Sequence, residues 1–388
     1  MKLFIFLCFS QALLCALVCG HHGGPHDDDH DHHDEPHHKS ESEALHQIST
    51  ANLKFSYNFF YHFATSYPHD NFFYSPMSIS IAFSLLSLGA KSKTLSQIHE
   101  GFCYNRSTIS EEMIHKGFQN LLKIFKDQKD GFKLDMANAL FTDNNLNLIE
   151  EFKDKAKKFY QSEAIATDFH KVQEAVEQIN SYVEKKTYGN IKDLLDNLDP
   201  LTALVIINTI FFKGSWVDTF NVDHTREEDF HVDENTVVKV PMMTRQGEYN
   251  IGYISEAECT VVEVPYKGNI TAIFIEIILS IPKFSISGEF DLVKELEHLG
   301  ITDVFSDHAD LSGITEDSRL KVSKAVHKAV LKVYEEGTEA SAATTAGITK
   351  ISLSLPQHIT INRPFFISIF RKDISMEVFS GRIINPTK

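Results

Sequence analysis

The sequence predicts an α+β fold, because helical patterns dominate its first half and strand patterns its second half. Helical periodicity begins at Ile48, and Ser75-Pro76 has the form of a helix start, with serine as the cap and proline in the first turn. Residues 204–212 form a continuous apolar run that is too rich in β-branched residues for a helix. An apolar content of 43% permits a large core, and no linker is evident after residue 47.

The first twenty residues predict a secretory signal. Lys2 precedes an apolar run that ends near Gly20, where a small residue would allow cleavage. A membrane anchor is the alternative, but the run is short and no later segment is long enough to span a bilayer. We therefore expect a secreted, extracellular protein that does not associate with membranes.

Residues 21–46 predict a disordered leader, because their hydrophobicity is low and their charge is high. Histidines alternate with acidic residues in this leader, and such a tail could bind zinc or copper weakly. The alternative is a solvated acidic tail whose charge changes as histidine titrates. The candidate metal ligands are His21, His22, His26, His30, His32, His33, His37 and His38.

Cysteine content and charge exclude several classes of protein. Of the five cysteines only Cys103 and Cys259 lie outside the signal, which is too few for a disulfide scaffold. The net charge of −16 argues against nucleic-acid or strong polyanion binding. The chain has no glycine-rich phosphate loop, Gly-x-Ser-x-Gly or His-Glu-x-x-His motif. We expect neither enzymatic activity nor a cofactor.

The remaining elements follow in chain order. Apolar residues surround nearly the whole helix after Ser75, which predicts that this helix lies inside the protein. Residues 171–196 predict a surface helix that continues through polar turns. Beyond the strand at 204–212, the Tyr266–Asn269 segment predicts a hairpin turn. Strands of a buried sheet are then expected at residues 359–361, 365–370 and 376–384.

Two N-glycosylation sequons occur in this chain. They are Asn105-Arg106-Ser107 and Asn269-Ile270-Thr271, and Asn269 falls on the predicted turn. Chance sequons are common, but exposed asparagines in a secreted protein are the ordinary acceptors. We expect glycosylation at both Asn105 and Asn269.

The segment from Glu335 to Ser352 has two acceptable conformations. At a period of two, one face carries small or uncharged residues from Thr338 to Ile348, and the other face is polar. The segment could therefore be an exposed loop, and it could also enter a crowded sheet as a strand. Composition alone favours a flexible linker. Two alternative states are the starting point for a mechanical switch.

This segment resembles the reactive-centre loop of the serpins, a family of serine-protease inhibitors. Six further segments match the family in order, at residues 71–79, 208–216, 309–314, 323–328, 362–365 and 381–386. Within the family, the antitrypsin and antichymotrypsin branch is the most similar. The resemblance implies one domain at 47–388, with three β-sheets surrounded by helices and an exposed mobile loop at about 335–358.

The resemblance implies a monomeric inhibitor that needs no catalytic group of its own. A serine protease would cleave the loop and be trapped as a covalent acyl-enzyme when the loop inserts into the central sheet. The inserting hinge would be Gly337, Thr338, Glu339, Ala340, Ser341 and Ala342. Its inward face has neither proline nor charge, which favours an active inhibitor.

The cleaved bond has three candidates. The family's count from Gly337 places it at Ile351-Ser352, whereas the residues before Pro356 place it at Leu353-Ser354. Lys350 is the third choice and would attract trypsin-like enzymes. The first two choices imply an elastase-like or chymotrypsin-like target.

Two groups of polar residues are implied to control the opening of the sheet. A hydrogen-bonded cluster under the sheet centre would contain Ser75, Ser78, Asn208 and His327. An ion pair at the top of the sheet would join Glu335 and Lys283 near Trp216. Ordinary satisfied polar groups are the alternative for each of them.

The chain departs from the family near residues 276–283. Two short helices that the family has after this strand are missing, so apolar surface should be left open and the monomer should tend to polymerise. The departure leaves open a deleted splice form with impaired inhibition. A non-inhibitory carrier of a hormone or small hydrophobic ligand is a further alternative, as is a metal-buffering or structural protein.

Overall fold

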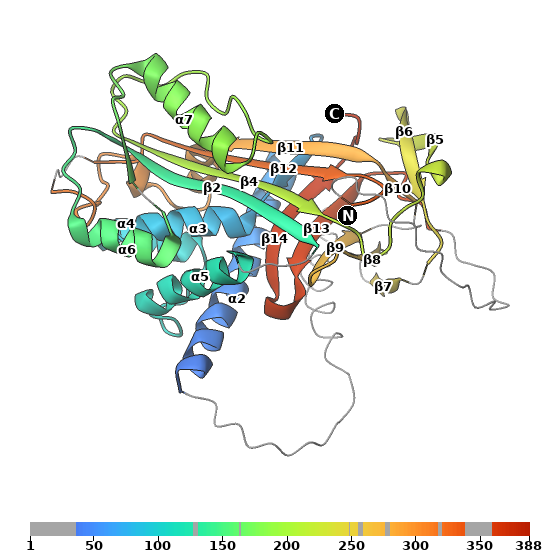
Figure 1. Ribbon diagram of the computed structural model, residues 1–388, viewed down its shortest axis with the longest axis horizontal. Coiled ribbons are helices and arrows are strands. Elements are labelled where there is room, and N and C mark those ends of the chain that lie inside the picture. The colour runs from blue at the N-terminus through green and yellow to red at the C-terminus, as the bar shows by residue number, and fades with distance from the viewer. Residues whose placement is uncertain are drawn as a thin grey trace.

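The computed structural model describes residues 36–126, 131–162, 164–247, 249–254, 259–275, 280–316, 320–337 and 359–388. A five-stranded sheet runs through the long dimension of the molecule (Figure 1). Helix α7 (Val172–Lys186) lies on one face of this sheet, and α3 (Pro76–Ser87) lies on the other. Because helices cover both faces of this sheet, the hydrophobic core has two parts, a small cluster under α7 and a large cluster around α3.

Seven helices occur in the described part of the chain. Besides α3 and α7, they are α2 (Pro36–Ser66), α4 (Ser92–Gly101), α5 (Glu111–Lys126), α6 (Glu150–Tyr160) and α8 (Leu292–Glu297). Three 3₁₀ turns accompany them, namely η1 (Val222–His224), η3 (Asp303–Phe305) and η4 (Lys372–Ile374). No described helix combines the length and the apolar character needed to cross a membrane.

Two helix boundaries differ from the sequence-based expectation. Helix α2 begins at Pro36, so the end of the segment expected to be disordered is helical. The reason is tertiary, because Ala44 is buried and its carbonyl lies against Gly117 of α5. Helix α7 ends at Lys186, before the expected 196, because Tyr188 and Gly189 both take positive φ angles, of 51° and 80°.

The five-stranded sheet has the order β11-β12-β4-β2-β3. Its strands are β11 (Phe284–Asp291), β12 (Lys324–Val333), β4 (Leu204–Gly214), β2 (Phe132–Asp143) and β3 (Ala164–Thr167). The central strands β12 and β4 are parallel, and their register runs from Lys324 opposite Val205 to Leu331 opposite Phe212. Strands β11 and β2 pair with them in the antiparallel sense.

Two further sheets complete the fold. A six-stranded sheet has the order β1 (Phe72–Tyr74), β14 (Met376–Ile383), β13 (Phe365–Arg371), β9 (Ile270–Ile275), β8 (Cys259–Pro265) and β7 (Asn250–Ile254). A three-stranded sheet has the order β10 (Ser280–Pro282), β6 (Val237–Thr244) and β5 (Arg226–His231). These sheets confirm the predicted α+β class.

The two strongest local predictions are confirmed. All twelve residues of α3 are buried, and the Ser75 side chain caps its first turn by accepting a hydrogen bond from the Ser78 amide at 3.1 Å. The β8–β9 hairpin turns at Gly268 and Asn269, whose φ angles are 82° and 60°. Glycine and asparagine are the residues that adopt positive φ angles at least cost, which explains why the turn falls at these two positions.

Candidate functional site at the seam between β4 and β12

The boundary between β4 and β12, which we call the seam, is a parallel pairing in the middle of the sheet. A strand that followed β12 after a tight turn would run antiparallel to β12. Because β4 is parallel to β12, that strand would also run antiparallel to β4. The seam can therefore accept the segment after β12 with two antiparallel ladders in place of one parallel ladder.

A buried polar cluster lies across the middle of the seam. The His327 ring on β12 contacts Asn208 on β4, with Nδ1 and Asn208 Oδ1 2.5 Å apart, and its Nε2 accepts the Ser75 amide at 3.0 Å. Asn208 Nδ2 donates to the Ser78 carbonyl at 2.8 Å. The Ser75 hydroxyl donates to the Val378 carbonyl at 2.6 Å. The cluster thus joins both strands of the seam to the start of α3.

The hydrogen bonds of His327 define its protonation state. Because Nε2 accepts a backbone N–H, the proton of the neutral ring must lie on Nδ1, where Asn208 Oδ1 accepts it. Complete burial lowers the pKa of His327 to about 3, and the hydrogen bond to Asn208 opposes this shift only in part. The ring is therefore neutral at physiological pH and links Asn208 to Ser75 as both donor and acceptor.

Asn138 on β2 belongs to this cluster and was not predicted. It lies directly opposite Asn208 in the sheet register, and its Oδ1 accepts from Asn208 Nδ2 at 2.5 Å. The sequence feature that could have indicated it is a single amide side chain, between Ala137 and Ala139, among inward-facing strand residues that are otherwise small or apolar. Only the strand register shows that this amide meets Asn208.

At one end of the seam, the predicted ion pair closes the sheet. Lys283 Nζ lies 3.0 Å from Glu335 Oε2, and the Thr225 hydroxyl donates to Glu335 Oε1 at 2.9 Å. Burial opposes the ionisation of Glu335, but its own backbone N–H, Lys283 and Thr225 outweigh burial and lower the pKa of this carboxyl. The charged pair fastens the end of β12 to the segment between β10 and β11.

Trp216 lies beside this ion pair, as the resemblance implied. The fully buried indole stacks on Tyr266 with ring centroids 3.9 Å apart. Its Nε1 donates to the Tyr334 carbonyl at 2.9 Å, and its amide donates to the Glu336 carbonyl at 3.1 Å. Trp216 is therefore hydrogen-bonded to both neighbours of Glu335 and fixes the path of the chain as it leaves β12.

Gly337 completes a tight turn at the end of β12. Its amide donates to the Tyr334 carbonyl at 3.1 Å, and its carbonyl accepts the Tyr334 amide at 2.7 Å. An isolated bridge also pairs Gly337 with Ser215, just after β4. A φ of 123° and the 2.0 Å that would separate a Cβ atom from the Gly214 carbonyl oxygen restrict this position to glycine. The chain has thus already reversed direction at the mouth of the seam.

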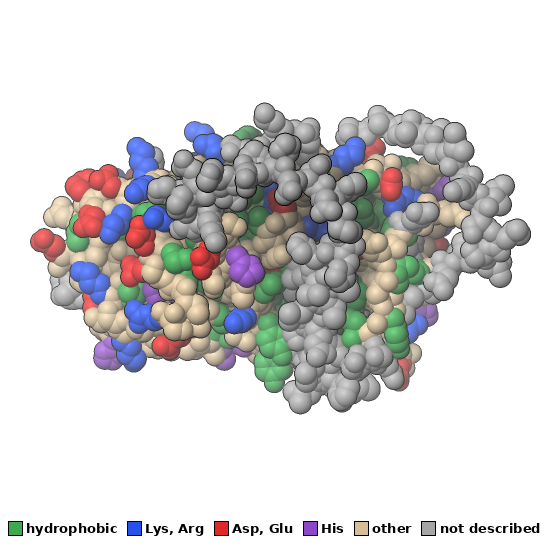
Figure 2. Space-filling model, turned by 90° about the horizontal axis from the view of Figure 1, so that it is seen from below, with side chains coloured by type: hydrophobic (Ala, Val, Ile, Leu, Met, Phe, Trp, Pro, Cys, Tyr) green, Lys and Arg blue, Asp and Glu red, His purple; other side chains and the backbone are tan. Residues whose placement is uncertain are grey.

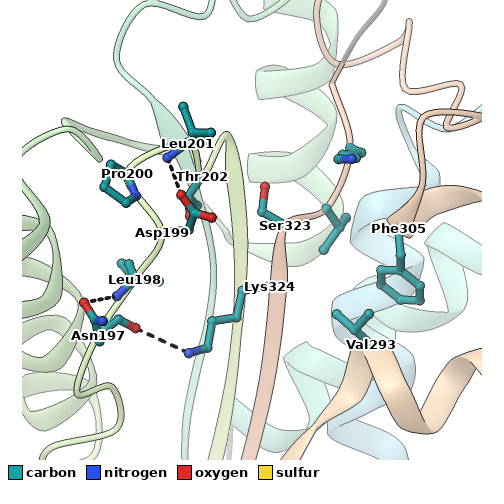
Figure 3. A pocket seen from close by; sticks show the side chains of 12 residues that line it. Asn197, Leu198, Asp199, Pro200, Leu201, Thr202, Val293, Phe305, Ser323 and Lys324 are labelled. Carbon is teal, nitrogen blue, oxygen red and sulfur yellow. Dashed lines mark hydrogen bonds between the residues drawn. The ribbon is translucent and has the colours of Figure 1, made fainter.

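A cavity of about 860 Å³ lies at the opposite end of the seam (Figure 3). It lies where β4 and β12 both begin, and Lys324 crosses it to donate to the Asn197 carbonyl at 3.4 Å. Half of its lining residues are apolar, namely Leu198, Pro200, Leu201, Val293, Phe305 and Val322. The lining is therefore mixed, with backbone and polar side chains beside these apolar groups.

Several predicted site residues lie outside the described residues. They are the signal at 1–20, the hinge from Thr338 onward, and the candidate bonds at Lys350, Ile351-Ser352 and Leu353-Ser354. The leader histidines up to His33 also lie outside. His37 and His38 fall in α2, but their side chains are not described. Within the described ranges, no group of three or more His, Cys, Asp or Glu residues could hold a metal ion.

Both sequon asparagines are exposed. Asn105 Oδ1 accepts from the Ser107 amide and hydroxyl in a local turn, whereas Asn269 occupies the positive-φ position of the β8–β9 hairpin. Elsewhere the visible described surface carries acidic and basic side chains interspersed, without a large patch of one sign (Figure 2).

The connection between β9 and β10, where the sequence departs from the family, is short. Strand β9 ends at Ile275 and β10 begins at Ser280, so four residues join the six-stranded sheet to the three-stranded sheet. Ile251 and Tyr253 on the edge strand β7 are 45% and 63% exposed. These side chains are apolar surface on the sheet that β9 belongs to.

A family model described as "Serpin (serine protease inhibitor)" matches residues 50–276 and 275–386. The chain belongs to the serpin family. The two matched segments meet at the short connection after β9, where the resemblance had placed missing helices.

Relatives and solved structures agree with this assignment. An alpha-1-antitrypsin-like protein of Tamias sibiricus is 42% identical over 90% of this chain and 91% of its own length. Alpha-1-antiproteinase 2 of Equus caballus is 41% identical over 90% of this chain and 89% of its own. Human glycosylated kallistatin superposes with a TM-score of 0.81 at 35% identity, covering 88% of this chain and 99% of kallistatin. Human thyroxine-binding globulin, complexed with thyroxine, gives 0.82 at 33% identity, covering 89% and 100%.

Proposed function

We propose that this serpin is a secreted, monomeric inhibitor of an elastase-like or chymotrypsin-like serine protease and acts as a suicide substrate. The observation that carries the proposal is the turn at Gly337. It directs the chain back along β12 at the mouth of a parallel seam, which is the direction an inserting strand must take. The similarity to proteins named antiproteinases supports the same class of partner.

The chemistry would come from the protease. Its serine hydroxyl would attack the carbonyl carbon of Ile351, the favoured candidate, and form an ester. The peptide bond would break and Ser352 would leave as a free amine that carries the rest of the chain. Leu353-Ser354 and Lys350-Ile351 remain the alternative bonds. Insertion of the freed segment, with the acyl-enzyme attached, would prevent water from completing hydrolysis in a distorted active site.

The energetics of insertion follow from the strand pairing. Opening the seam would break eight residue pairs of one parallel ladder, and the new strand would form a ladder on each of its two sides. The residues from Thr338 to Ala342 are small or uncharged on one face, so they can enter without burying a charge. Net gain of backbone hydrogen bonds and buried area would then drive the movement.

The polar cluster and the ion pair would control when the seam opens. Separation of β4 from β12 must break the contact between Asn208 and His327, and movement of β12 must also break the bond from Ser75 to His327. Glu335 and Lys283 hold the mouth at which the hinge would enter. These contacts give the native form kinetic stability until a protease cuts the loop.

The decisive experiment is incubation of the secreted protein with elastase, chymotrypsin and trypsin. A complex that survives SDS, together with the sequence of the released C-terminal peptide, would establish inhibition and identify the bond. Complete cleavage by all three enzymes without a stable complex would contradict the proposal. Mass spectrometry of the same preparation would report the signal cleavage and the use of Asn105 and Asn269.

Carriage of a small ligand is a second candidate, which rests on the similarity to thyroxine-binding globulin and on the cavity between Asn197 and Lys324. Quenching of the fluorescence of Trp216, the single tryptophan, by titrated hydrophobic hormones would test it. Saturable binding without a covalent protease complex would favour the carrier.

A further inference from the structure

Glu377 is a buried carboxyl that the proposed mechanism does not use. It is the second residue of β14 and is fully buried between the six-stranded sheet and α2. The Ser368 hydroxyl donates to its Oε1, whereas its Oε2 has no hydrogen-bond partner among the described residues. No cationic side chain forms an ion pair with it in the described ranges. An ionised Glu377 would therefore be an uncompensated charge in the core.

A small polar layer surrounds this carboxyl. Tyr74, Ser380 and Ser368 lie side by side across β1, β14 and β13, because Tyr74 pairs with Ser380 and Ser380 pairs with Ser368. Helix α2 supplies Ser56, whose carbonyl accepts the Tyr74 hydroxyl at 2.9 Å. All members of this layer except Glu377 are hydroxyl groups, so the layer suits a neutral acid.

The titratable groups around the layer do not supply a compensating charge. Burial, followed by the field of Glu377, raises the pKa of Tyr74, so this phenol stays neutral. Arg371 and Asp373, which precede β14, pair with each other at 2.9 Å. Burial raises the pKa of Glu377 to about 7, and the hydroxyl groups of Ser368, Ser56 and Ser380 oppose this rise only in part.

The strand that carries Glu377 is also connected to the seam. A β-bulge interrupts the pairing of β13 with β14, because Ile369 lies opposite Phe379 but Phe370 lies opposite Glu377. Val378 is therefore the extra residue, and its carbonyl accepts the Ser75 hydroxyl. The Glu377 carbonyl accepts Asn52 of α2 at 2.9 Å. A shift at Glu377 would reach Ser75, and through it the His327 ring on β12.

We propose that Glu377 is a pH-dependent lock of the native fold, which holds α2, β14 and the cap of α3 together when neutral and loosens them when ionised. The inference concerns the intact protein and does not depend on protease inhibition. Loosening would weaken the Ser75 contact to β12 and make the seam easier to open under mildly alkaline conditions.

The sign of the effect follows from proton linkage. Between pH 4.5, the ordinary pKa of a glutamate, and about 7, the folded protein holds a proton on Glu377 that the unfolded chain has lost. The contribution of Glu377 to native stability must therefore fall as pH rises through this window and then level off. The unfolding equilibrium constant should rise about tenfold per pH unit from this group.

The test compares the full-length wild type with Glu377→Gln, which keeps the size and hydrogen-bonding capacity but cannot ionise. Urea unfolding midpoints are measured from pH 5 to pH 8.5. We expect the advantage of the variant over wild type to grow up to about pH 7 and then to stay constant. Glu289→Gln, which removes a half-exposed carboxyl paired with Lys328, is the matched control and should keep the wild-type pH profile.

Two further measurements test the inference, and the first keeps it falsifiable even if the Gln variant fails to fold. Ser368→Ala removes a hydrogen bond that favours the ionised form, so the pH-dependent window should extend to higher pH. Hydrogen exchange of β12 amides near His327 should be faster in wild type than in Glu377→Gln at pH 8.5 and equal at pH 5. Parallel unfolding curves, an unmoved window in Ser368→Ala, or equal exchange at pH 8.5 would each overturn the lock.

Discussion

Replacement of Asn208 by leucine tests whether the cluster holds the seam closed. Leucine has the same number and branching of side-chain heavy atoms but no polar atoms, so the His327 Nδ1–H would lose its acceptor and Asn138 Oδ1 would lose its donor. His327 is fully buried, so water does not replace the lost acceptor. Each stranded buried group costs about 1–3 kcal/mol, so we expect the free energy of unfolding to fall by roughly 4 kcal/mol.

Thr209→Val is the matched control in the next position of the same strand. Thr209 is also fully buried, but its hydroxyl has no hydrogen-bond partner among the described residues. Valine has the same shape and removes an unsatisfied polar atom, so the free energy of unfolding should stay within about 1 kcal/mol or increase. Both variants remove a buried polar group from β4, but we expect Asn208→Leu to lower the free energy of unfolding and Thr209→Val to leave it unchanged or raise it.

Thermal and urea unfolding measure both variants. An unfolding entropy of about 2.1 cal/mol/K per residue, for a body of about 340 residues, converts 4 kcal/mol to a shift of about 6 °C. The Asn208→Leu protein should also form loop-inserted polymers at a lower temperature, which native gels detect. Equal midpoints for the two variants, or a stable Asn208→Leu, would show that the cluster does not hold the seam.

Four further outcomes are expected. Thr338→Arg should convert an inhibitor into a substrate, because insertion would bury an unpaired charge; an unchanged stoichiometry of inhibition would contradict this. The loop-cut protein should melt well above the intact one, since a full extra strand can enter the seam; equal midpoints would argue for the carrier. The contribution of His327 to stability should fall as pH drops from 6.5 to about 3, because the unfolded chain gains a proton that the buried ring excludes, and His327→Gln should flatten the stability curve below about pH 4.5, where Glu377 is protonated in both states. On mild heating the chain should polymerise at a lower temperature than a version with two helices restored at residues 276–283. Equal onset temperatures in light scattering would contradict this prediction.

The fold class and the best-defined elements could be predicted because their signals are local. The cap at Ser75, the apolar surround of α3 and the hairpin at Asn269 each depend on residues within one turn or one strand. Helix α2 was predicted to start too late because the composition of its first residues is that of a disordered segment. Its extension depends on the contact of Ala44 with α5, which no local pattern records.

The candidate site could be predicted only in part, since its contacts join distant segments. Glu335 and Lys283 are 52 residues apart and were paired only through the resemblance, yet they meet at 3.0 Å. Asn138 and Glu377 were not predicted at all. Each is an isolated polar residue in a strand, and only the register and a β-bulge bring it to its partners.

The position of Ser75 has a consequence for the proton balance of unfolding. Its amide binds His327, and its hydroxyl binds the residue next to Glu377, so one capping serine connects two buried groups of opposite proton preference. Between about pH 4.5 and 6.5, unfolding would release a proton from Glu377 and take one up at His327. The two exchanges nearly cancel, so this part of the core makes stability almost independent of pH across mildly acidic fluids. Replacement of either residue alone would remove that compensation, and the free energy of unfolding would then show the full pH dependence of the residue that remains.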